Sequence, residues 1–100
     1  MSHIHIQRPH QLGLAAARQA AFAWAEKAEE KFDLECTYAE GEAQDCVTFE
    51  RSGVSGELRV EPDMFTLEMQ LGFFASAFKH KIESELNAQF DALLAPPPRR

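Results

Sequence analysis

The sequence is poor in cysteine, with two among its 100 residues, and this excludes the disulfide-dense scaffold of a small secreted protein. No apolar run approaches the roughly 18 residues that a membrane span needs, and the polar start lacks the apolar stretch of a signal peptide. Lysine and arginine number 10 against 16 acidic residues, and a net charge of −6 opposes binding to a phosphate backbone. We therefore expect a cytoplasmic protein that binds no nucleic acid.

Motifs that carry chemistry are also missing. The chain has no glycine-rich phosphate loop, no Gly-x-Ser-x-Gly elbow, no His-Glu-x-x-His and no Cys-x-x-Cys. What is present is the balance of a globular protein, 45% hydrophobic and 26% charged residues. We predict one domain over residues 1–95 and a disordered Pro/Arg tail over 96–100, and we expect neither enzymatic activity nor a metal or cofactor.

Hydrophobic periodicity gives the order of elements as β-α-β-β-β-β-α. Alternation of apolar and polar residues predicts strands at 2–7, 34–39, 46–51, 54–60 and 65–71. Between 11 and 31 the chain has neither proline nor a β-branched residue but many alanines, which predicts a long helix. Apolar residues at three- and four-residue spacing predict a second helix over 73–94, with Lys79–Glu83 and Lys81–Glu85 pairs on its exposed side. We expect an α+β two-layer sandwich in which both helices cover one face of an antiparallel sheet.

The register of the hairpins follows from the strand phases. A turn at Ser52–Gly53 places Phe49 opposite Gly56 and Val47 opposite Leu58. Pairing Val60 with Phe65 then places every apolar residue of the next strand opposite another apolar residue. In this register Gly56 leaves room for the ring of Phe49.

The alanine-rich first helix presents an apolar face that includes Ala17, Ala21 and Trp24. Alanine permits close approach of another backbone, which is either the protein's own sheet or the helix of a second subunit. Ala17, Ala21 and Trp24 are therefore candidate contacts of a homodimer.

Several polar residues allow a chemical and a structural interpretation. Cys36 and Cys46 fall on opposite sides of their strands, which opposes a disulfide, and Asp45 beside Cys46 would raise the pKa of a nucleophilic thiol.

His3 and His5 share one strand side and supply at most two metal ligands, so they suit a solvated face as well as a metal site. Four glutamates fall on the polar sheet face: Glu35, Glu50, Glu57 and Glu68. They either form an acidic cluster, or they make cross-strand pairs and contacts with solvent.

Phenylalanine is abundant, with eight in the chain, and three of them gather where the last strand meets the last helix. Phe73, Phe74 and Phe78, with Leu71, are either core residues or an exposed apolar contact that forms the mouth of a ligand site. The sequence alone leaves both interpretations open.

The strand-hairpin-strand block from Asp45 to Val60, with Gly-Val-x-Gly at Gly53–Gly56, is followed by Leu71–Gly72–Phe73–Phe74 and by Phe78–Lys79–x–Lys81–Ile82–Glu83. In this order the segments resemble the polyhydroxyalkanoic acid system family, small proteins associated with bacterial polyester granules. The resemblance covers His3 to Leu94 and supplies no catalytic residues.

The resemblance implies a setting, the polyester-storage system, rather than a mechanism. Together with Phe73, Phe74 and Phe78 it leads us to expect a non-enzymatic accessory protein in the cytoplasm that binds the granule surface or a granule protein through apolar surface. The alternative is a small carrier that holds a hydroxyacyl chain or another apolar ligand between the sheet and the last helix.

Overall fold

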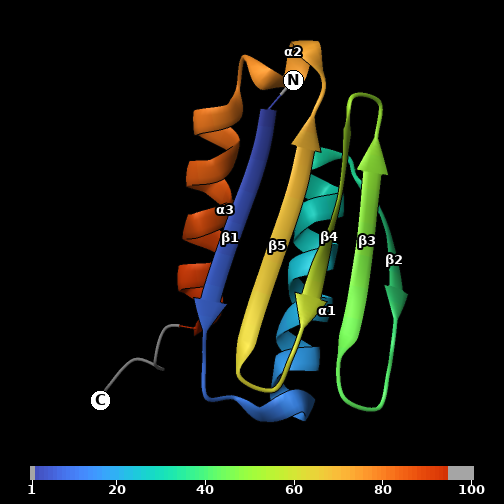
Figure 1. The fold of residues 1–100 in the computed structure, drawn as a ribbon, viewed down its shortest axis with the longest axis vertical. Helices are drawn as coiled ribbons and strands as arrows, with labels where there is room; N and C mark the ends of the chain where they lie inside the picture. The colour runs from blue at the N-terminus through green and yellow to red at the C-terminus, as the bar shows by residue number, and fades with distance from the viewer. Residues whose placement is uncertain (1, 95–100) are drawn as a thin grey trace.

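The computed structural model describes residues 2–94 as a five-stranded antiparallel sheet with helices on one face (Figure 1). The elements follow in the predicted order, so the α+β architecture is confirmed. Their bounds are β1 Ser2–Pro9, α1 Gly13–Phe32, β2 Glu35–Ala39, β3 Asp45–Arg51, β4 Val54–Val60, β5 Met64–Leu71, α2 Phe73–Ser76 and α3 Lys79–Leu94. The tail predicted at 96–100 lies outside the described residues.

The sheet has the order β1-β5-β4-β3-β2. Strands β2 to β5 are a meander, and β1 joins its far edge by pairing antiparallel with β5. Every predicted partner is confirmed, including Phe49 opposite Gly56, Leu58 opposite Leu67 and Val60 opposite Phe65. The register is fixed because a slip of one residue would turn the whole apolar set toward water.

Helix α1 lies on the apolar face of the sheet and packs there through its alanine stripe. Ala17, Ala21 and Trp24 are at most 1% exposed, so they are core residues and cannot contact a second subunit in this fold. Trp24 stacks on Phe90 of α3 and meets the ring of Phe49 edge-on. These rings join both helices to the sheet in one core.

The last helix differs from the prediction of one continuous element over 73–94. Helix α2 ends at Ser76, and α3 begins only at Lys79. Between them the amides of Ala77 and Phe78 donate to Phe74 and Ala75, an i to i−3 pattern that tightens the turn. The predicted apolar stripe is therefore divided: Leu86 and Phe90 lie in the core, whereas Phe74 and Phe78 do not.

Polar contacts hold α3 against the edge of the sheet. Arg8 on β1 pairs with Asp91 and donates to Asn87, which ties the edge strand to α3. No helix in the described part of the chain is long and apolar enough to span a membrane.

Candidate functional site

Three exposed phenylalanines belong to the segment that follows β5, Phe73 and Phe74 in α2 and Phe78 just before α3. Helix α2 lies at one end of the molecule (Figure 1). Phe73 is 82% exposed, Phe74 85% and Phe78 60%. Phe73 and Phe74 contact each other edge to face with ring centroids 5.5 Å apart. The structure thus excludes the core interpretation for these rings. Such adjacent exposed rings are unusual on a surface that meets only water. We refer to Phe73, Phe74 and Phe78 together as the phenylalanine cluster.

Leu71 differs from these three rings. It is 1% exposed and faces Val54 of β4 and Ser2 of β1 within the core. The strand alternation that buries Met69 also buries Leu71, so the structure removes it from the candidate contact surface.

An open groove of about 670 Å³ lies beside the cluster. It runs between the C-terminal end of α1, the turn that joins β3 to β4, and the start of α3. Its apolar residues come from all these elements and from the sheet: Phe32, Leu34, Val54, Met69, Phe74, Ala75, Phe78 and Ile82. Phe74 and Phe78 belong to both the cluster and the groove, whereas Phe73 lies outside the groove.

Charged side chains also line the groove. Arg51 donates from Nη1 to the carbonyl oxygen of Phe32 at 2.7 Å, which holds its guanidinium at the end of α1. Lys31 pairs with Glu85 at 3.6 Å. The predicted Lys79–Glu83 and Lys81–Glu85 pairs do not form, and Lys81 has no ion pair among the described residues. The groove therefore combines apolar surface with three cations and one carboxylate.

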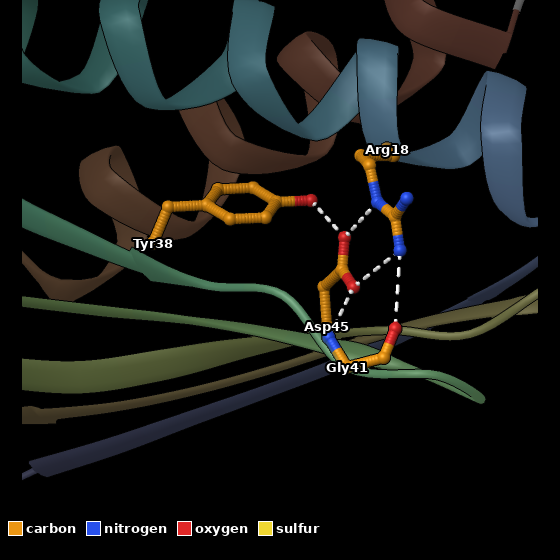
Figure 2. Close-up of polar contacts among 4 residues, drawn as sticks. All are labelled: Arg18, Tyr38, Gly41 and Asp45. Carbon is orange, nitrogen blue, oxygen red and sulfur yellow. Dashed lines mark hydrogen bonds and ion pairs between the residues drawn. The ribbon is translucent and has the colours of Figure 1, made fainter.

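The most buried charge in the described residues is Asp45, at the start of β3 (Figure 2). Its carboxylate accepts two hydrogen bonds from Arg18 of α1, at 2.6 and 2.9 Å. The Tyr38 hydroxyl donates at 2.5 Å, and the Gly41 amide at 3.0 Å. Both carboxylate oxygens are therefore occupied.

Electrostatics at this cluster stabilise one protonation state. The hydrogen bonds from Arg18 lower the pKa of Asp45 to about 2, against the opposing effect of burial. Burial and the bond to Asp45 raise the pKa of Tyr38 above its usual range. The carboxylate thus stays ionised and paired at neutral pH, which suits a fixed link between α1 and the loop before β3. The sequence prediction began this strand at residue 46 and therefore did not include Asp45. The alternation could have indicated its burial, because residues 45, 47 and 49 lie on the same side of the strand.

Both cysteines are free thiols, Cys36 opposite Phe49 and Cys46 opposite Ala39. Burial raises the pKa of each thiol to about 11. At Cys46 the carboxylate that adds to this effect is Glu57, whose Oε2 lies 3.1 Å from the sulfur. The sequence pointed to Asp45 for this role, but that side chain faces the helices.

The outer sheet face is polar. Glu35 lies opposite Glu50, and Glu57 opposite Glu68, so neither pair is a cross-strand salt bridge. His3 and His5 both face Glu68, at 3.5 and 3.8 Å. Within residues 2–94 no three His, Cys, Asp or Glu side chains gather as they would around a metal ion.

The fold and its surface define a small α+β domain with one covered and one polar sheet face and an apolar end. A family model described as "Putative polyhydroxyalkanoic acid system protein" matches residues 4–94, and the chain belongs to this family. The resemblance seen in the sequence is thereby confirmed. Neither the curated proteins nor the solved structures contain a match to the chain.

Proposed function

We propose that the protein is a non-enzymatic accessory protein of the polyhydroxyalkanoic acid system that contacts the polyester surface of the granule, in the cytoplasm, through the phenylalanine cluster. The observation that carries the proposal is the exposure of three phenylalanine rings within one six-residue segment, Phe73–Phe78, two of which are in contact. An aliphatic polyester offers the apolar surface that such rings would bury, and the family's name supplies the setting.

The energetics are adequate for this role. Burying a phenylalanine side chain contributes roughly 1.5–3 kcal/mol relative to leaving it in water. Three rings would supply several kcal/mol before the costs of association, which suits reversible attachment. The net charge of −6 would keep the rest of the domain in water.

The polar clusters support a structural role more than a chemical one. Asp45 has no free oxygen with which to accept a proton, because both are hydrogen-bonded. The raised pKa of Cys36 and of Cys46 keeps both thiols protonated at neutral pH, and the thiolate is the nucleophile. These features favour a binding protein over an enzyme.

The groove favours a second candidate function, a small carrier that holds a hydroxyacyl chain or another apolar ligand between the sheet and α3. Its volume of about 670 Å³ lies in the usual range of ligand sites. Native mass spectrometry of protein purified from its own host tests the carrier function, since a carrier should retain a bound apolar ligand.

Co-sedimentation with polyester granules tests the proposal. Phe73→Ser removes the ring of an 82% exposed residue and should leave the fold intact. We expect about tenfold weaker retention, since roughly 1.4 kcal/mol of lost burial is a factor of ten. Phe22→Ser is the control, because Phe22 is 39% exposed on α1 and stacks on Tyr38 of the edge strand β2, three strands from β5. This variant should be retained like the wild type.

Protein-free polyester particles form the second arm of this experiment. Retention on these particles supports direct contact with the polyester. Retention on native granules alone would assign the contact to a granule protein and overturn the proposal, as would equal absence of wild type and Phe73→Ser from both pellets.

A further inference from the structure

The groove beside the phenylalanine cluster differs in charge from the rest of the protein. Acidic residues outnumber lysine and arginine by 16 to 10 in the sequence. Among the residues that line the groove, the balance is reversed: Lys31, Arg51 and Lys81 stand against Glu85 alone. An apolar groove with a cationic border is complementary to a ligand that has an aliphatic chain and an anionic end.

The positions of these cations are not explained by helix stability. Helix α3 has no acidic residue in its first turn and carries Lys79 and Lys81 there. The dipole of a helix favours acidic side chains at its N-terminal end, so lysines at these positions weaken the helix. Lys81 also has no ion pair among the described residues. Its charge is therefore available to a ligand in the groove.

Arg51, at the end of β3, lines the same groove as Lys81. Its hydrogen bond to the carbonyl of Phe32 uses one terminal nitrogen and fixes the side chain at the groove. A guanidinium has five N–H donors, so the others remain able to bind a carboxylate in the bidentate geometry that this group favours. The apolar side chains of Met69 and Val54, on the sheet, line the same groove as Arg51 and Lys81.

We infer that this groove binds a single aliphatic chain by its carboxylate end, with Arg51 and Lys81 holding the carboxylate and the apolar sheet residues receiving the chain. A hydroxyalkanoic acid, the unit of the polyester named by the family, has this chemistry. The assignment rests on the proposed function and deepens it, because Phe74 and Phe78 form a wall of the groove and also belong to the cluster. A chain end or a released acid at the granule would thus meet the groove directly.

Titration of the full-length protein with sodium 3-hydroxydecanoate, below its micelle concentration, tests the inference by NMR chemical shifts. We expect shifts at Val54, Met69 and Ile82, and binding that weakens as salt screens the charges. The methyl ester lacks the negative charge, and its affinity should be lower than that of the acid by a factor of about ten or more. Equal affinity for acid and ester would overturn the inference, as would the absence of shifts in the groove.

Two variants locate the carboxylate. Lys81→Gln and Arg51→Gln should each lower the affinity about tenfold, and Lys81→Gln keeps the test valid if loss of the Arg51 contact to α1 disturbs folding. Arg59→Gln is the matched control, because Arg59 lies on the polar sheet face opposite Cys46, and its affinity should equal that of the wild type. Unchanged affinity of a folded Lys81→Gln protein would contradict the assignment.

Decanoate is the arm that separates a hydroxy acid from an ordinary fatty acid. Binding of 3-hydroxydecanoate as tight as that of decanoate or tighter supports the hydroxyalkanoic acid, and a tenfold preference for decanoate overturns it. Phe73→Ser, outside the groove, should bind 3-hydroxydecanoate normally. Granule retention without acid binding would refute this inference alone, and acid binding without granule retention would refute the proposed function alone.

Discussion

Asp45 is a buried charge whose every oxygen is paired, and it links α1 to the loop before β3 (Figure 2). A buried carboxylate is tolerated only when several donors replace the water that it loses. Arg18, Tyr38 and the Gly41 amide supply these donors from three separate segments. Removing the charge would leave all three with a poorer acceptor.

Asp45→Asn should lower the free energy of unfolding by about 2 kcal/mol at pH 7, the usual value of hydrogen bonds to a charged group. The pKa of the carboxyl falls from 3.8 to about 2 on folding. Its stabilising effect is therefore complete above pH 4 and is lost as the pH falls toward 2. Urea unfolding of both proteins between pH 7 and pH 2 measures this.

The control for this prediction is Glu42→Gln, an exposed carboxylate in the same loop, which should change stability little. A difference between wild type and Asp45→Asn that stays constant from pH 7 to pH 2 would contradict the account of Asp45.

At the scale of elements, the sheet could be predicted almost completely from the sequence and the helical end could not. Apolar alternation fixes the phase of each strand, and a two-residue turn at Ser52–Gly53 then leaves one register. The break after Ser76 depends instead on local i to i−3 hydrogen bonds, which the regular spacing of Phe74, Phe78 and Ile82 conceals. The cations of the groove were missed for another reason. The four-residue spacing predicts a pair of Lys81 with Glu85, whereas in the fold Glu85 pairs with Lys31 of α1, a tertiary contact that spacing within one helix does not show.

Gly56 shows how closely the strands and their side chains approach. A Cβ at this position would lie 2.2 Å from the backbone oxygen of Glu68 and 2.8 Å from the ring of Phe49. Gly56→Ala should therefore lower the free energy of unfolding by about 2–3 kcal/mol, as overpacking does. Urea denaturation measures the change in midpoint.

Ser55→Ala, on the exposed face of the same strand, is the control and should stay within about 0.5 kcal/mol of the wild type. If Gly56→Ala is as stable as Ser55→Ala, then the tight approach of β3 and β5 around residue 56 is not a requirement of the fold.

At the scale of the whole molecule, the domain is polarised. Helices α1 and α3 cover one sheet face, and α2 lies at one end of the molecule (Figure 1). The other sheet face is polar, and the exposed rings belong to α2 and to the residues just after it. The sequence identified Phe73 and Phe74 as candidate contact residues but did not predict their exposure. Both follow directly after a buried strand, where a core position was equally consistent with the pattern. Their accessibility is decided by the path of the chain after Gly72, which tertiary packing sets.

Hydroxyl-radical footprinting of the protein with and without protein-free polyester particles tests the role of this end most directly. Oxidation of Phe73, Phe74 and Phe78 should fall on the particles, while that of Phe22, 39% exposed on α1, should not change. Unaltered oxidation of the three rings in particle-bound protein, or an equal fall at Phe22, would show that the polyester is met by another surface.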